Sequence, residues 1–203
     1  PRHARVEQEP WPPAPEAVPD RAGAAGPGGV DAGAWTAYPG GAAFCRRVAA
    51  GESPRAVWQA LPGGDGAVWA ELVATAVVAC RAGGRGSVLV VPSAAEVELL
   101  TTALSAAGVA EWSPGAAGGF VRLVAEDGPA ARYRAFLAVS RGAADVVVGT
   151  RAAAFAPVRD PGLLLCWDDG DALHAEPRAP YPHTREVLAM RSAASGAALL
   201  VGG

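Results

Sequence analysis

The chain has 203 residues and a formal net charge of −3, and 51% of its residues are hydrophobic. This length fits one ordinary domain with a tail, or two very small domains. The chain contains 48 Ala, 26 Gly and 18 Pro but no Lys, Ile or Asn, which is typical of a very GC-rich genome. The missing lysine excludes a G-x-x-x-x-G-K-[ST] phosphate loop and a Schiff-base lysine, and the missing asparagine excludes N-glycosylation.

Charge and cysteine content narrow the class of protein further. A pI near 5.6 is not that of a free-standing nucleic-acid-binding domain, although it is compatible with a DNA-binding assembly whose basic surface lies elsewhere. The three widely spaced cysteines, Cys45, Cys80 and Cys166, predict reduced cytosolic thiols and form no metal pattern. No apolar run approaches the ~18 residues of a membrane span. Without an initiator Met or a signal peptide, the chain is expected to be a cytoplasmic fragment cut at both ends.

Residues 1–40 hold eight of the 18 prolines and predict an extended or disordered interdomain linker. Trp11 and Trp35 could dock on a neighbouring domain, but a linker that touches nothing is favoured. From residue 41 onward, helical spacing alternates with short apolar runs. The helix at 130–140 is expected to turn Tyr133, Phe136 and Leu137 inward. The expected helices are 42–50, 68–81, 96–106, 130–140 and 185–194, and the expected strands are 55–61, 87–92, 120–124, 145–149, 163–167 and 197–201.

Short apolar strands interleaved with amphipathic helices predict a doubly wound, mostly parallel α/β sheet with helices on both faces, over residues 41–203. Ligands of such sheets bind outside the carboxyl ends of the strands. The loops of interest are therefore 62–67, 92–95, 149–153 and 167–176.

The first of these loops carries Gly63, Gly64 and Gly66 before a helix, which is the right context for backbone N–H groups to bind phosphate. It has no lysine and no Ser or Thr after the last glycine, and Asp65 adds negative charge. A plain strand-to-helix turn is the favoured interpretation.

The loop after Trp167 carries the carboxylates of Asp168, Asp169 and Asp171. These residues could bind a divalent cation through oxygen ligands, or they could form a solvated turn that caps a helix. His174 and His183 lack the spacing of a zinc pair and are expected at the surface.

A third loop, 149–153, carries Thr150 and Arg151 directly after a glycine. A hydroxyl and a guanidinium at a strand end could contact a phosphate, or Thr150 could cap a helix N-terminus.

The segments between residues 146 and 203, taken in chain order, resemble those of the first helicase lobe of the PriA family of primosomal replication-restart proteins. The members of this family are superfamily 2 DNA helicases. Residues 149–157 are similar to the family's G-T-R-S-A-x-F-x-P, and residues 199–203 are similar to the strand that ends in its G-S-A-T. Residues 88–92 and 132–137 are similar to two further family segments. The resemblance covers roughly 55–203, and the family's D-E-E-H box falls on residues 167–170.

Departures from the family pattern bear on its ATPase. The family's G-S-G-K-T falls near residues 63–68, where no lysine or hydroxyl is present. Trp167 replaces the aspartate that would hold Mg²⁺, Asp168 stands at the water-activating carboxylate, and Gly170 replaces the histidine. Phosphoryl transfer needs Mg²⁺ and a cation against the phosphates, and both binding residues are missing. Gly63, Gly64 and Gly66 are then a degenerate nucleotide loop, and Asp168 and Asp169 a degenerate acidic box.

The resemblance implies a RecA-like lobe with a P-loop NTPase-type fold, truncated at its C-terminal end. It implies a DNA-binding part of a replication-restart protein that recognises stalled forks and single-strand–duplex junctions and promotes primosome assembly. Its partners would be primosome proteins and the replicative helicase loader, at the nucleoid. On the family's G-T-R motif, Thr150 and Arg151 are expected to touch the DNA backbone.

The main alternative is an active ATP-dependent 3′–5′ DNA helicase with an atypical site that uses ATP and Mg²⁺. A folded spacer between DNA-binding domains is a third possibility. The family's zinc would lie outside this chain.

Overall fold

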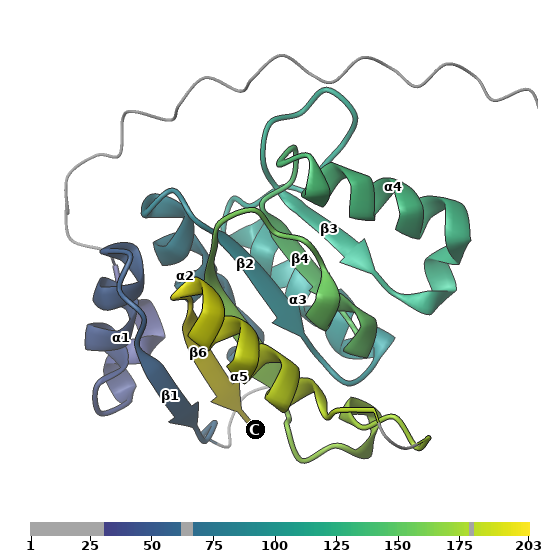
Figure 1. Ribbon diagram of the computed structural model, residues 1–203. Helices are drawn as coiled ribbons and strands as arrows, with labels where there is room; N and C mark the ends of the chain where they lie inside the picture. The colour runs from purple at the N-terminus through teal and green to yellow at the C-terminus, as the bar shows by residue number, and fades with distance from the viewer. Residues whose placement is uncertain (1–30, 62–66, 179–180) are drawn as a thin grey trace, which may run out of the picture.

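The computed structural model of the protein describes residues 31–61, 67–178 and 181–203. These residues form a six-stranded parallel sheet between two layers of helices (Figure 1). The order across the sheet is β1-β6-β5-β2-β4-β3. The doubly wound α/β prediction is confirmed. The strands are β1 (Arg55–Trp58), β2 (Gly86–Val90), β3 (Phe120–Leu123), β4 (Val146–Gly149), β5 (Pro161–Trp167) and β6 (Ala198–Gly202).

Three helices, α1, α2 and α3, pack on one face of the sheet, and α4 and α5 pack on the other. In Figure 1, α5 crosses in front of the sheet and α2 lies behind it. None of the helices that the structure describes is long and apolar enough to cross a bilayer. The helices are α1 (Gly41–Ala49), α2 (Val68–Ala82), α3 (Ala94–Ala106), α4 (Gly128–Ser140) and α5 (Thr184–Ser195), with short 3-10 helices η1 (Gly33–Ala37), η2 (Ala125–Asp127), η3 (Arg151–Phe155) and η4 (Ala172–His174).

Alternate residues of the inner strands supply two separate cores. On β5, Leu163, Leu165 and Trp167 face α1, α2 and α3, whereas Leu164 and Cys166 face the layer of α4 and α5. All five side chains are buried. This burial on both faces explains why the strands are continuously apolar and do not alternate.

The part of the expected linker that the structure describes, residues 31–40, packs on the domain. Trp35 in η1 is only 3% exposed, and its Nε1 donates to the carbonyl oxygen of Leu72 at 2.7 Å. The expectation that the linker touches nothing is therefore wrong for Trp35, and Trp11 lies outside the described residues. The proline content of the segment hid an indole that supplies both apolar area and a satisfied N–H donor.

Helix α4 is present, but its predicted inward face is wrong. Tyr133 is 59% exposed and Phe136 is 43% exposed, and Leu137 is only partly buried. The side chains that α4 buries are the small Ala138 and Val139. A helix with small inward residues can approach β3 closely, and its bulky residues then point into solvent.

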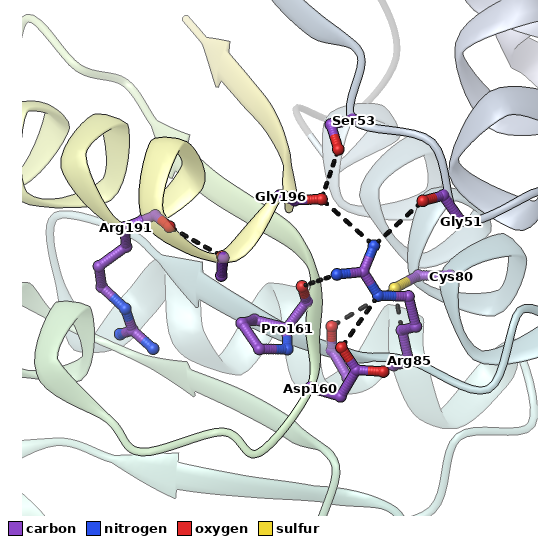
Figure 2. A network of polar contacts seen from close by, with 10 residues as sticks. Gly51, Ser53, Cys80, Arg85, Asp160, Pro161, Arg191 and Gly196 are labelled. Atoms are coloured by element: carbon purple, nitrogen blue, oxygen red, sulfur yellow. Dashed lines mark hydrogen bonds and ion pairs between the residues drawn. The ribbon is translucent and has the colours of Figure 1, made fainter.

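Arg85 holds the amino-terminal end of the sheet together (Figure 2). Its guanidinium donates to the carbonyl oxygens of Gly51 and Gly196, each at 3.3 Å, and of Pro161 at 2.7 Å. It also pairs with Asp160 at 3.2 Å. These partners belong to the turn after α1, the turn after α5 and the start of β5, so one half-buried cation joins three segments that are distant in the sequence.

Candidate functional site

Two tryptophans stack where β5 and the N-terminal end of α2 converge. Trp167 ends β5, and Trp69 lies in the first turn of α2; their ring centroids are 4.4 Å apart and their planes differ by 9°. Trp58 at the end of β1 lies 5.1 Å from Trp167, and Trp35 lies 4.9 Å from Trp58. All four indoles are at most 8% exposed. These four residues, the tryptophan cluster, fill this corner with apolar rings.

A glycine on β6 leaves the space in which two indoles of the tryptophan cluster meet. Gly202 of β6 stands in register between Trp58 of β1 and Trp167 of β5. A Cβ at Gly202 would lie 2.7 Å from the Cε3 atom of Trp58 and 3.2 Å from that of Trp167. The absence of a side chain at this position lets the two indoles meet across the intervening strand.

The expected phosphate-loop residues Gly63, Gly64 and Gly66 lie outside the described residues. The elements described at the tryptophan cluster are the end of β5 and the first turn of α2, which follows that loop in the sequence. Each of these two elements contributes one indole to the stacked pair of Trp167 and Trp69. A metal or phosphate site would instead need oxygen or nitrogen donors at this position.

The acidic turn after β5 is largely engaged by the chain itself. Asp169 pairs with Arg185 of α5, and Asp171 accepts the backbone N–H of Leu173 at 2.7 Å, which caps η4. Asp168 has a φ of 49°, in the left-handed region. Among the described residues, no group of three His, Cys, Asp or Glu side chains is arranged to hold a metal ion. This geometry favours the capping interpretation of the turn.

His174 is fully buried, so its expected surface position is wrong. Its Nε2 donates to the carbonyl oxygen of Trp167 at 2.7 Å, and its own carbonyl accepts the Thr184 hydroxyl at 3.1 Å. His174 thus ties the end of β5 to the start of α5. No local pattern indicates this, because His174 lies in a loop segment bounded by Asp171 and Glu176, where a surface position is the ordinary expectation.

His183 is half-buried beside it and caps α5. Its Nδ1 accepts the backbone N–H of Arg185 at 3.1 Å. Burial, followed by the positive charge of Arg185, lowers the pKa of His183. Both effects disfavour the imidazolium, so the cap depends on the neutral ring.

The three cysteines are free and buried, as expected for reduced thiols. Burial raises the pKa of Cys45 and of Cys80 to about 11 and that of Cys166 to about 12. Since the thiolate is the reactive form, these side chains act as packing groups.

Arg151 joins the start of η3 to the segment after β5. Its Nη1 donates to the carbonyl oxygens of Leu173 at 3.1 Å and Ala175 at 2.9 Å, and its Nη2 pairs with Glu176 at 2.6 Å. A hydrogen bond from Arg178, together with the charges of both arginines, lowers the pKa of Glu176. Although Arg151 makes these contacts, 35% of its side chain stays exposed.

Thr150 and Arg151 line a groove of about 630 Å³ at the carboxyl ends of β2, β3 and β4, the β4 groove. Thr150 is the N-cap residue of η3, but its hydroxyl makes no capping bond. Three exposed apolar side chains form part of the rim, namely Phe155, Leu173 and Tyr181, which are 62%, 54% and 65% exposed. The groove therefore combines a hydroxyl, a guanidinium edge and exposed rings at the edge of the sheet where ligands bind.

No family model matches the chain. The chain is 42% identical over 202 residues to a protein of Mycobacterium leprae named probable replication restart protein PriA, and 42% identical over 204 residues to the protein of the same name from Mycobacterium tuberculosis. Both matches cover 100% of this chain. The chain spans only 29% and 28% of these two relatives.

Proposed function

Because the chain belongs to the PriA family of replication restart proteins, we propose that it forms a DNA-binding lobe that does not itself hydrolyse ATP. In this role the whole protein recognises stalled forks and single-strand–duplex junctions at the nucleoid. It promotes primosome assembly together with primosome proteins and the loader of the replicative helicase. The chain spans less than a third of its relatives' length, so these activities are proposed for the whole protein.

The stacked pair of Trp69 and Trp167 carries the proposal that this lobe lacks ATPase activity. Phosphoryl transfer depends on Mg²⁺ and a cation placed against the phosphates. The chain has no lysine to supply that cation. In the family pattern Trp167 stands at the Mg²⁺-binding aspartate, and its buried ring lies against another ring, which offers a metal no oxygen ligand.

Nucleotide titration of the whole protein tests this proposal. We expect no saturable binding of Mg-ATP by calorimetry and no phosphate release on addition of forked DNA. Saturable binding with DNA-stimulated hydrolysis would overturn it, provided that Asp168→Ala abolishes both and the exposed Glu111→Ala leaves both intact. That outcome would favour the active helicase with an atypical site.

We also propose that DNA meets the lobe in the β4 groove, through the Thr150 hydroxyl and the exposed edge of Arg151. The support is geometric: both residues line an open groove at the carboxyl ends of the strands, and the hydroxyl has no capping role. Arginine and hydroxyl donors of this kind bind backbone phosphates.

Two variants separate a phosphate contact from a structural role of Arg151. Arg151→Ala removes the cation and frees the segment at 173–176, whereas Glu176→Gln breaks the ion pair but keeps the cation. In fork-binding titrations across salt concentrations, Arg151→Ala should weaken binding and reduce the salt slope by about one. Glu176→Gln should bind as well as the unchanged protein. Equal losses in both variants would assign Arg151 to positioning alone.

A further inference from the structure

The outer face of α4 carries aromatic rings and arginines that the fold does not use. Tyr133 and Phe136 are 59% and 43% exposed, and Arg132 and Arg134 are exposed beside them. Figure 1 shows α4 at the end of the molecule opposite β1. The two rings stand one helical turn apart, at positions i and i+3, which are neighbours on a helix surface.

These arginines differ from most others in the structure. Helix α4 contains no Asp or Glu, and Arg132, Arg134 and Arg159 form no ion pair with a carboxylate among the described residues. Arg159 lies at the C-terminal end of the helix, where its Nε donates to the carbonyl oxygen of Ser140 at 3.3 Å. Ion pairs do engage Arg47, Arg81, Arg85, Arg122, Arg151, Arg178 and Arg185. The α4 helix therefore presents Arg132 and Arg134 with no carboxylate of its own, and the acidic residues next to it in the chain, Glu126 and Asp127, precede its first turn.

We propose that Arg132, Tyr133, Phe136 and Arg159, the α4 face, bind single-stranded DNA. The bases stack on the two rings, and the phosphates lie against the two arginines. Stacking suits single strands because an unpaired base exposes its ring face, whereas a duplex hides it. This inference rests on the proposed function, namely that the protein binds DNA, and adds a second contact surface to it.

The dimensions of the face fit an extended strand. Arg132 and Phe136 are separated by one helical turn. The carbonyl oxygen of Ser140 accepts the hydrogen bond from Arg159. Ser140 is eight residues beyond Arg132, which corresponds to about 12 Å along the helix axis. The segment just before α4, η2, lines the β4 groove through Ala125 and Glu126. A strand that leaves the groove at η2 can therefore continue along α4.

The test uses a fluorescent single-stranded oligothymidine probe and a duplex of the same length, with fluorescence anisotropy on the whole protein. Tyr133→Leu/Phe136→Leu keeps apolar side chains but removes both rings. We expect it to lose about tenfold or more in affinity for the single strand and little for the duplex. Thermal unfolding monitored by circular dichroism verifies that the variant is folded.

Charge is tested with two matched double variants. Arg132→Gln/Arg159→Gln and Arg46→Gln/Arg55→Gln each remove two exposed arginines, the second pair from α1 and β1. The α4 pair should reduce the salt slope for single-stranded DNA by about 1.4, since each neutralised phosphate contributes ~0.7. The control pair should leave the slope unchanged.

Three outcomes overturn the inference while leaving the proposed function in place: single-strand affinity that survives loss of both rings, equal losses for single strand and duplex, and equal slopes for the two arginine pairs. Retained single-strand affinity with loss of a protein partner would reassign the face to protein binding. Absence of any DNA binding by the unchanged protein would overturn the proposed function and this inference together.

Discussion

The two ends of the parallel sheet are built for different purposes. At the amino-terminal end, Arg85 is only 15% exposed and joins three segments through carbonyl oxygens and Asp160 (Figure 2). At the carboxyl-terminal end, the tryptophan cluster closes the corner at β1 and β5, while the β4 groove stays open beside it. One end is cross-linked by a single arginine, and the other combines a corner filled with indoles and an open groove.

The arginines at the two ends show the difference most directly. Both Arg85 and Arg151 donate to carbonyl oxygens of distant segments and pair with one carboxylate. Arg151, however, keeps 35% of its side chain exposed, against 15% for Arg85. The same residue type can thus serve purely as a cross-link or can also present charge to a partner, depending on how far the fold covers it.

The largest effect is expected from Trp167→Asp, which introduces at the tryptophan cluster the carboxylate that the resemblance implies for this position. The charge would be buried between indoles, so we expect a loss of about 3–5 kcal/mol in the free energy of unfolding, measured with urea. Trp167→Phe should lose only about 1–2 kcal/mol. If Trp167→Asp is as stable as the unchanged protein and binds Mg-ATP, the tryptophan cluster marks an open site. The contrast between the filled tryptophan cluster and the open β4 groove would then be wrong.

The second largest loss of stability is expected from the removal of Arg85 at the amino-terminal end of the sheet. Arg85→Ala leaves the carbonyl oxygens of Gly51, Gly196 and Pro161 without this donor, and we expect a loss of about 2–4 kcal/mol in the free energy of unfolding. Arg178→Ala is the control, because its side chain is 82% exposed and should cost about 0.5 kcal/mol or less. Similar losses in the two variants would show that the amino-terminal end does not depend on Arg85.

A third test concerns the space in which the tryptophans meet. Gly202→Ala places a Cβ within 2.7 Å of Trp58, and we expect a loss of about 1–3 kcal/mol in unfolding free energy from overpacking. Gly170→Ala is the matched control, since nothing lies within 4 Å of its Cβ. An equal stability of both variants would mean that the indoles can shift without cost.

Much of the fold was predictable because it depends on local pattern. The helices were predicted to within two residues at each end, and only β1 was badly bounded, since it ends at Trp58 and not at residue 61. The errors of orientation at α4 and at Trp35 came from tertiary context. Phe136 faces outward because Ala138 and Val139 make the contact with the sheet, and Trp35 packs inward because Leu72 offers its indole a hydrogen-bond acceptor.

The candidate site was predictable only in part. The loops at 92–95, 149–153 and 167–176 follow β2, β4 and β5 as predicted, and Thr150 and Arg151 lie on one groove, whereas the loop at 62–66 lies outside the described residues. The tryptophan cluster was not foreseen, because its members come from positions 35, 58, 69 and 167 and meet only through the strand order. The partners of Arg151 are likewise set by the path of the chain after β5, which local sequence does not encode.

The smallest expected effect is a pH dependence of the free energy of unfolding that arises at the carboxyl-terminal end of the sheet. His183 caps α5 through its neutral Nδ1, and burial lowers its pKa below the ordinary 6.5. As the pH falls below 6.5, the unfolded chain binds the proton first, so this contribution to stability is complete above 6.5 and is lost progressively below it. We expect the free energy of unfolding to fall by about 1 kcal/mol or less between pH ~7.5 and ~5.5, measured with urea.

His183→Asn identifies the source of this pH dependence. Asn is a good N-cap and does not titrate, so the variant should keep the stability of the unchanged protein near pH 7.5 and lose most of the slope. Both histidines among the described residues, His174 and His183, lie at the carboxyl-terminal end of the sheet, whereas the cross-link at the other end uses Arg85 and Asp160 and no histidine. An unchanged slope in His183→Asn would place the titrating group elsewhere, whereas a flat profile would assign acid sensitivity to the end of the sheet that carries the β4 groove.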